Sequence, residues 1–299
     1  VGGGSAGWLT AGIIAARHNP LDTADQGIKV ILLESPDVAN LGVGEGTWPT
    51  MRDTLRQIGI SEVDFLKACD VSFKQGSQFI NWQRGEGESY YHPFVPPAGY
   101  GSLNLAAHWL NGDSDLNFAD AVCPQGKVCD LRLAPKTPQT PEYAFGLNYG
   151  YHLNAGKFVE LLKSHCVDKL GVDYQIGHVD QIVAADNGDI SGLYLSNGEQ
   201  ISGDLFVDCT GFAALLIGKH YQVPFVSQRD CLFNDTALAV QVNHADENTP
   251  IASCTKSTAQ SSGWVWDIAL PTRRGIGHVF SSQHVSLEKA EDELLHYLE

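Results

Sequence analysis

The first residues that could do chemistry are the glycines at the start of the chain. The run Gly2-Gly3-Gly4-Ser5-Ala6-Gly7 leads into helix-forming residues, and the apolar stretch from Ile28 to Leu33 ends in Glu34. A tight turn, close approach of the backbone to a pyrophosphate and packing of helix on strand each exclude a Cβ, so glycine suits this loop. The helix N-terminus offers N–H groups to phosphate, and an acidic residue can accept hydrogen bonds from a ribose diol. The pattern predicts a dinucleotide site at Gly2, Gly4, Ser5, Ala6, Gly7 and Glu34.

A later segment carries a second glycine signal. The stretch from Gly203 to Phe212 predicts an apolar strand that brings Asp208 and Gly211 to a turn. Alone, it is equally an ordinary buried strand in which Asp208 caps the turn. Coupled to the first loop, it favours a fold in which a late segment returns to the cofactor, and we expect that cofactor to be FAD.

The loop from Gly42 to Pro49 follows the strand that ends in Glu34. It is polar and rich in glycine, which suits a strap over the flavin ring built from Gly42, Val43, Gly44 and Glu45. A plain surface loop is the alternative.

Lys74 is a single cation in an apolar stretch. Its neighbours in the sequence are Val71, Phe73, Phe79, Ile80 and Trp82. Most lysines are solvated surface charges, and the residue type alone favours that interpretation. A cation in such a setting either extends its charged end to water or has a function.

Trp264 and Trp266 lie two residues apart, in a segment that continues to Ile268. On a strand they share one face and could form an aromatic wall beside a cofactor or a tunnel. Core packing is the commoner role of such a pair.

The composition argues against several classes of partner and site. With 19 basic and 35 acidic residues the formal net charge is −16, which repels phosphate backbones, so we expect no nucleic acid partner. No apolar run approaches the ~20 residues that cross a bilayer, and a cytoplasmic location fits best. The seven cysteines include no C-x-x-C pair, and His108, His152, His178 and His278 show no metal spacing. We therefore expect no disulfide framework and no metal, and hydrogen-bonded structural roles for these histidines.

The elements that position these residues alternate between helix and strand. Residues 7–16, 156–163 and 287–299 predict helices, residues 172–176 and 181–185 predict strands, and residues 192–201 predict a hairpin about Asn197-Gly198. Residues 90–140, rich in Pro, Gly, Asn and Asp, predict long loops or an irregular insertion. Only Val1 precedes the first glycine loop, where a strand is expected, so we expect an excerpt of a longer chain.

The fold class expected is α/β, an FAD/NAD(P)-binding module like that of glutathione reductase and the aromatic hydroxylases, with a substrate-side β-sheet. Residues 1–60 and 150–222 form the FAD module in this interpretation. Residues 61–149 and 223–299 form the substrate side.

Six segments resemble the flavin-dependent halogenases of the tryptophan halogenase family. They are Gly2 to Trp8, Gly42 to Pro49, Phe73 to Gly76 with Asn81-Trp82, Tyr151 to Ala155, Asp204 to Phe212, and Gly263 to Ile268. The last departs from the family pattern, in which proline follows the isoleucine directly, because Ala269-Leu270 precede Pro271 here. This departure bears on membership of the tryptophan-specific branch more than on membership of the wider family.

The resemblance implies an activity. A separate flavin reductase supplies reduced FAD, which with oxygen and chloride or bromide yields hypohalous acid. The acid passes through a tunnel to a lysine beside an indole or other electron-rich aromatic, and that lysine corresponds by motif to Lys74. The family's catalytic glutamate and halide site fall after Glu299, so no residue is assigned to them. A homodimer is compatible with the sequence.

Two other functions remain open at this point. The FAD motifs alone are shared with flavin monooxygenases that hydroxylate an aromatic. A flavin-binding homologue without catalysis would also keep them. Lys74 and the tryptophan pair favour the halogenase.

Overall fold

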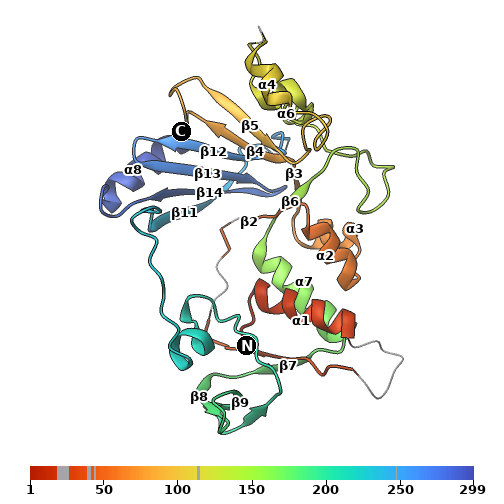
Figure 1. Ribbon diagram of the computed structural model, residues 1–299, viewed down its shortest axis with the longest axis vertical. Coiled ribbons are helices and arrows are strands. Elements are labelled where there is room, and N and C mark those ends of the chain that lie inside the picture. The colour runs from red at the N-terminus through yellow and green to blue at the C-terminus, as the bar shows by residue number, and fades with distance from the viewer. Residues whose placement is uncertain (19–26, 39–41, 44, 113–114, 247) are drawn as a thin grey trace. The chain divides into compact units, whose positions relative to one another are not determined.

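The computed structural model describes residues 1–18, 27–38, 42–43, 45–112, 115–246 and 248–299. Its contacts divide the chain into two compact units (Figure 1). Unit 1 comprises residues 1–41, 57–60 and 156–227, and unit 2 comprises residues 42–56, 61–155 and 228–299. Among the described residues, no helix is long and apolar enough to cross a membrane.

Unit 1 is built around the first glycine loop. Its helices and strands are α1 (Ser5–His18), β1 (Ile31–Glu34), α7 (Ala155–Asp168), β7 (Asp173–Ile176), β8 (Val179–Ala184), β9 (Ile190–Leu195) and β10 (Gln200–Ser202). A 3₁₀ turn at Gly211–Ala213 and a π-helical turn at Leu215–His220 follow. Strands β1 and β7 pair in parallel, with Glu34 opposite Ile176. The predicted order of loop, helix and strand is therefore confirmed.

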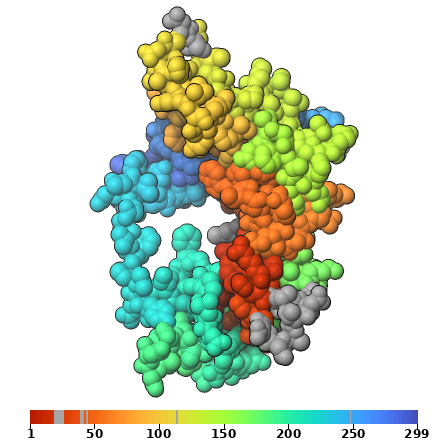
Figure 2. Space-filling model, turned by 45° about the vertical axis from the view of Figure 1, so that its right-hand side comes forward, coloured from red at the N-terminus to blue at the C-terminus, as the bar shows by residue number. Residues whose placement is uncertain are grey.

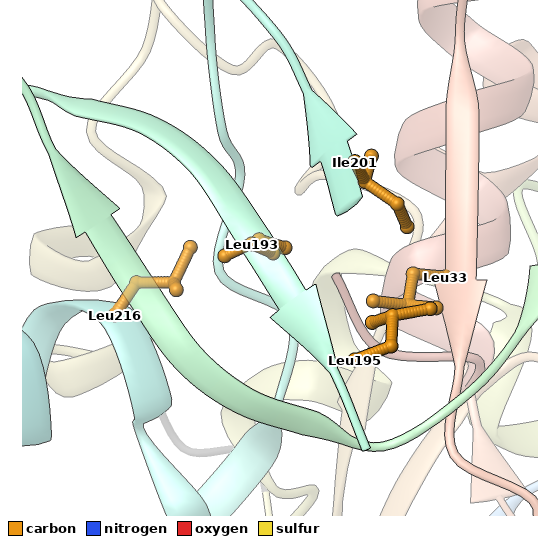
Figure 3. Packing of buried hydrophobic residues seen from close by; sticks show 5 residues of the cluster. All are labelled: Leu33, Leu193, Leu195, Ile201 and Leu216. Carbon is orange, nitrogen blue, oxygen red and sulfur yellow. The ribbon is translucent and has the colours of Figure 1, made fainter. Parts of the chain in front are cut away.

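The hairpin of unit 1 forms a three-stranded antiparallel sheet in the order β10-β9-β8. Gly198 has φ +87° at the turn, a conformation that glycine adopts without strain, and the expected hairpin is confirmed. The sheet packs on β1 through a leucine-rich core (Figure 3). Its buried residues are Leu33, Leu193, Leu195, Ile201 and Leu216. This core holds the end of β1, and so Glu34, in place.

Residues 203–210 form no regular strand, which corrects the prediction from their apolar sequence. Among the described residues, Val1 bonds to this segment: its N atom donates to the Val207 carbonyl, and the Cys209 N–H donates to the Val1 carbonyl. The Gly2 N–H donates in turn to the Leu33 carbonyl, so Val1 and Gly2 link the two extended segments.

A cavity of 670 Å³ continues from this link within unit 1. It lies between residues 27–33, residues 201–207 and one side of α1. Its walls are the backbone edges of two extended segments and apolar side chains such as Leu193 and Phe206. These walls do not form the convergent polar set that would orient a polar ligand.

Unit 2 is organised by a six-stranded sheet in the order β11-β14-β13-β12-β4-β5 (Figure 1). Its elements are β2 (Glu45–Gly46), α2 (Met51–Ile58), α3 (Glu62–Ala68), β3 (Ser72–Lys74), β4 (Gly76–Ile80), β5 (Ser89–Pro93), α4 (Leu105–Leu110), α5 (Phe118–Val122), α6 (Gln125–Asp130), β6 (Gly150–Leu153), β11 (Thr236–Asn243), β12 (Thr255–Gln260), β13 (Gly263–Ala269), β14 (Arg273–Phe280) and α8 (Leu287–Leu298). A second sheet of three strands has the order β2-β6-β3. All pairs in the large sheet are antiparallel except β12 with β4.

Helix α8 covers one face of the large sheet. Ser286 caps it by accepting a hydrogen bond from the Lys289 N–H. Val265 of β13 packs against Leu294 of α8 in a buried cluster, and the Tyr297 hydroxyl donates to Asp267. Since residues alternate along a strand, β13 presents Trp264, Trp266 and Ile268 on the opposite face.

Residues 90–140 contain more regular structure than the sequence predicted. The short helices α4, α5 and α6 form within them, and α5 and α6 lie against β5. Residues 100–112 and 115–130 form the yellow surface in Figure 2. Each helix spans only five or six residues, too few to show a helical period in the sequence. The expectation of long loops or an irregular insertion therefore missed these three short helices.

Candidate cofactor and catalytic sites

The glycine loop of unit 1 has no room for side chains. A Cβ on Gly2 would lie 2.2 Å from the Cys209 carbonyl oxygen, and a Cβ on Gly7 would lie 1.8 Å from the Gly2 carbonyl oxygen. Gly2 also has φ +113°, which L side chains rarely adopt. Helix α1 begins at Ser5, so the N–H groups of its first turn, from Ser5, Ala6 and Gly7, have no partner within the helix. The structure thus places the free N–H groups of a helix N-terminus directly after Gly4, an arrangement that can bind an anion.

Glu34 lies beside this loop. A Cβ on Gly3 would be 2.3 Å from the Glu34 Cδ, so the carboxylate passes directly under the loop backbone. The Tyr174 hydroxyl donates to Glu34 (2.7 Å), and Lys163 Nζ lies 3.9 Å from the same oxygen and donates to the Tyr174 hydroxyl (2.8 Å). Tyr174 and Lys163 were not singled out from the sequence. Only their positions on β7 and α7, beside β1, reveal them.

Asp208 makes a dense set of local hydrogen bonds. Its Oδ1 accepts from the Thr210 N–H and hydroxyl, and its Oδ2 accepts from the N–H groups of Leu216 and Ile217. Burial raises the pKa of Asp208, but these hydrogen bonds outweigh it and the net pKa is lowered. Asp208 therefore caps the turn, the alternative that the sequence left open. Gly211 follows at φ +61°, and the cofactor role of both residues stays a prediction.

The loop predicted as a strap belongs to unit 2 by its contacts. The Gly42 carbonyl accepts from Gln241 Nε2 (3.2 Å), and Glu45 accepts from the N–H groups of Val43 (3.1 Å) and Ala155 (3.0 Å). Burial raises the pKa of Glu45. Gly44 lies outside the described residues. The loop is thus anchored within unit 2 at both ends of the predicted strap, and its role toward a flavin stays a prediction.

Lys74 is buried in unit 2 beside a pair of aromatic rings. Its side chain leaves β3 with the residue only 9% exposed, and Nζ lies 5.6 Å from the ring centroids of both Trp48 and Phe94. A Cβ on Gly46 would come within 3.0 Å of Nζ. Among the residues that the structure describes, Lys74 forms no ion pair with an acidic side chain. Burial lowers the pKa of the Lys74 ammonium, and a charge interaction with Cys254 opposes that only in part.

His152 lies next to Lys74 and is fully buried. Its Nε2 is 2.8 Å from the Thr255 hydroxyl, and its Nδ1 is 3.5 Å from the Ser72 hydroxyl. Ser72 donates to the Ala269 carbonyl, so the proton of this pair sits on His152 Nδ1. Burial, and then the positive charge of Lys74, lower the pKa of His152 to about 3. The histidine is neutral near pH 7, and its hydrogen-bonded structural role is as expected.

The aromatic neighbours of Lys74 differ from those that the sequence suggested. Trp48 and Phe94 lie against the ammonium, although Phe94 is 20 positions along the chain. Phe79 and Trp82 instead contact each other (5.6 Å between centroids) within the sheet region. Trp48 is part of the Gly42 to Pro49 motif, so that motif could have indicated it as a site residue. No motif in the sequence indicated Phe94.

Trp264 and Trp266 share one face of β13, as predicted. Their ring centroids are 6.4 Å apart, and Trp82 lies 6.1 Å from Trp264. Gly277 on β14 pairs with Trp266, and a Cβ there would lie 2.1 Å from its ring. The pair is thus partly packed within unit 2, while its role in a tunnel stays a prediction.

The chain is similar to several known proteins. It is 32% identical to the tryptophan 6-halogenase ThaL of Streptomyces albogriseolus, over 97% of this chain and 56% of that protein. The tryptophan 7-halogenase RebH of Lentzea aerocolonigenes gives the same identity and coverage. A solved tryptophan halogenase from Shewanella frigidimarina superposes with a TM-score of 0.95 at 53% identity, over 99% of this chain and 58% of that one. The chain thus spans less than two thirds of the length of these relatives.

The mixed α/β fold matches solved structures of flavin-dependent halogenases, including Xcc4156 of Xanthomonas campestris, at 32% identity and a TM-score of 0.86. The family model described as tryptophan halogenase matches residues 1–299. The chain belongs to the tryptophan halogenase family, and the resemblance seen in its motifs is confirmed.

Proposed function

We propose that the full-length protein is an FAD-dependent halogenase that uses oxygen and chloride or bromide to halogenate an indole or other electron-rich aromatic. The loop of unit 1 fits a dinucleotide, because its glycines exclude a Cβ and Glu34 lies under the loop backbone. The proposed fold is accordingly the FAD/NAD(P)-binding module. Residues Gly2, Gly4, Ser5, Ala6, Gly7 and Glu34 would hold FAD, with Asp208 and Gly211 nearby in the chain's return to Val1. Bound and reduced, FAD would supply the activation of oxygen that oxidises halide.

The observation that carries the halogenase proposal is the state of Lys74. A buried cation without an acidic partner costs stability, and proteins keep such groups where they act. Trp48 and Phe94 give Lys74 a weak electrostatic partner, since cation–π contacts extend to about 6 Å. These rings stabilise the ammonium without neutralising it.

Lys74 could act on hypohalous acid in two ways. As an ammonium it would donate a hydrogen bond and polarise the oxidant, and as a free amine it would capture the halogen as a haloamine. The lowered pKa increases the fraction of free amine at a given pH. The neutral His152 next to it does not compete for a proton near pH 7.

We further propose a separate flavin reductase as the source of reduced FAD. The halide site and any carboxylate that acts on the substrate have no assigned residue among positions 1–299. A homodimer is a further proposal, and size-exclusion chromatography with light scattering would test it.

The experiment is product analysis of the full-length protein with a flavin reductase, chloride or bromide, and tryptophan or a set of indoles. We expect products whose masses increase by one halogen. Lys74→Ala should abolish them while FAD binding, measured by fluorescence titration, and oxygen consumption persist. The matched control Lys67→Ala removes an exposed lysine of α3 and should change nothing. Retained halogenation in Lys74→Ala contradicts the role of Lys74, and products that gain only oxygen indicate a hydroxylase.

A further inference from the structure

Two cysteines of unit 2 meet inside the protein. Cys129 belongs to α6, and Cys254 lies immediately before β12. They are 6% and 3% exposed and form one buried cluster with Tyr91. Both are free thiols. The two thiols therefore lie in one apolar cluster of the core.

The surrounding hydrogen bonds hold this thiol pair in place. Gln75 donates through Nε2 to the Ser253 hydroxyl (3.0 Å), and its backbone N–H donates to the Ser253 carbonyl (2.7 Å). On the other side, the Tyr91 hydroxyl donates to Asp130, the residue after Cys129 (2.7 Å). Both thiols are thus attached to fixed backbone, and they stay near each other without a large motion.

The thiol pair is also close to the proposed catalytic lysine. The Gln75 N–H donates to the carbonyl of Ser253, the residue before Cys254 (2.7 Å). Gln75, which fixes Ser253, is the next residue after Lys74. An oxidant held at Lys74 therefore has the thiol of Cys254 in its surroundings.

The two thiols are suited to different parts of an oxidation. Hydrogen bonds from Cys254 and Ser253 lower the pKa of Cys129, while the bond to Cys129 and burial raise the pKa of Cys254. The thiolate is the nucleophile in sulfur oxidation, so Cys129 attacks first and Cys254 resolves the product.

We propose that Cys129 and Cys254 form a modification site at which hypohalous acid produced in the protein closes a disulfide. The Cys129 sulfur takes the halogen as a sulfenyl halide, and hydroxide leaves and takes up the thiol proton as water. The Cys254 sulfur then displaces halide, giving the disulfide, one halide ion and one proton. Two thiols are oxidised by two electrons and one hypohalous acid is reduced. The inference rests on the proposed function for the source of the oxidant, and it makes the dithiol a trap for oxidant that meets no aromatic substrate.

The test adds the oxidant directly to the full-length protein. A Cys231→Ser background removes the exposed cysteine that shares a tryptic peptide with Cys254. After one equivalent of hypochlorous acid, free thiols are blocked with N-ethylmaleimide and the unreduced protein is digested with trypsin. We expect residues 128–132 linked to residues 230–256 as the main product, the loss of two thiols per equivalent, and reversal by dithiothreitol.

Other cysteines provide the controls. Cys166 is also buried and donates to the Trp8 carbonyl (3.6 Å), so it should stay reduced. Cys123→Ser changes a buried cysteine near the pair and should leave the link unchanged, whereas Cys129→Ser and Cys254→Ala should each abolish it while keeping the wild-type melting temperature within a few degrees. A link between Cys123 and Cys129, equal oxidation of Cys166, or oxidation to sulfinic acids without a link overturns the proposal.

A second arm separates this inference from the proposed function. With reductase, reduced nicotinamide, FAD and chloride but no aromatic substrate, the same link should accumulate, and added substrate should slow it at least tenfold. If the disulfide forms with added hypochlorous acid but never during turnover, the dithiol is oxidisable, but the enzyme is not the source of its oxidant. No link in either arm overturns the inference, whatever products the enzyme makes.

Discussion

Two of the buried charged residues of unit 2, Glu62 and Lys74, have opposite surroundings. Glu62, 1% exposed at the start of α3, accepts hydrogen bonds from Lys136 (2.8 Å), the Tyr149 and Tyr151 hydroxyls (2.5 and 2.7 Å) and a backbone N–H (2.6 Å). Lys74 has two rings at 5.6 Å and no acidic partner among the described residues. Among the described residues, the Glu62 carboxylate has a full set of hydrogen-bond partners, whereas the Lys74 ammonium has ring contacts alone.

The difference separates stability from function. A buried charge with a complete set of partners fixes the elements around it, here α3, β6 and the segment of Lys136. A buried charge without them is kept at a cost in stability. Variants that remove either buried charge, or one partner of it, test this difference.

The largest effect should come from Lys74→Met, which keeps the shape and removes the charge. Halogenation should fall by about 10²- to 10⁴-fold, the range typical of a lost proton-transfer or electrophile-holding group. The melting temperature should stay the same or rise by a few degrees. Because the folded pKa of Lys74 is lowered, wild-type stability increases as pH rises toward the ordinary lysine pKa of 10.5. Thermal scans at several pH values should show that gain in the wild type and not in Lys74→Met, and a large loss of stability in the variant would contradict the comparison.

Glu62→Gln should have the opposite effects: a loss of stability with little change in the rate of halogenation. It leaves Lys136, itself 9% exposed in its side chain, without a countercharge, and breaking a buried pair costs about 3–5 kcal/mol. Urea unfolding should report that loss, while any halogenation by the folded fraction keeps its rate. Glu142→Gln is the matched control: Glu142 is exposed and accepts from Ser61 and Val63, so its change should cost at most about 1 kcal/mol. Equal effects of the two variants would sink the assignment of stability to Glu62.

Acid should remove the contribution of Glu62 progressively. Burial raises its pKa, but hydrogen bonds from Lys136, Tyr149, Tyr143 and Tyr151 outweigh this, so its folded pKa lies below the ordinary 4.5. The contribution is complete above pH 4.5 and is lost as pH falls through the folded pKa. The difference in unfolding free energy between wild type and Glu62→Gln should therefore shrink below pH 4.5, and a constant difference down to pH 3 would contradict the lowered pKa.

The smallest effect should come from Trp48→Leu, which removes one ring beside Lys74. Trp48 is 61% exposed, and a cation–π contact at such a site is worth about 0.5–1 kcal/mol. Losing it weakens the stabilisation of the ammonium, so the lower limb of the pH–rate profile should shift to lower pH with a two- to fivefold change in rate. Trp48→Phe keeps a ring and should lie between Leu and wild type. An unchanged pH–rate profile in Trp48→Leu would contradict a stabilising effect of the Trp48 ring on the Lys74 ammonium.

The sequence predicted what depends on local pattern. The glycine loop, α1 and the Asn197-Gly198 hairpin could be predicted because each depends on the steric properties of residues that are adjacent in the sequence. The motif resemblance identified Lys74 and the tryptophan pair on β13. It could not describe the setting of Lys74, because Phe94 and His152 reach it through strand pairing between distant segments.

Two predictions differ from the structure. Residues 203–210 form no regular strand. Residues 90–140 contain three helices of five or six residues, too short to show a helical period in the sequence, and two of them, α5 and α6, pack on β5. Partners of Glu34, such as Tyr174, were hidden because hydrogen bonding between parallel strands leaves no mark in sequence spacing.

The parallel pairing of β4 with β12 has a consequence for biosynthesis. Residues 76–80 are made early, but their partners, residues 255–258, emerge only after most of the chain described here has been translated. At about 5–20 residues per second, β4 waits on the order of ten to thirty seconds for that edge. Thr255, which completes the surroundings of His152, arrives in the same late strand. The lysine site therefore cannot be completed before residue 255 has been translated, and slower translation between these strands would prolong the exposure of an apolar edge.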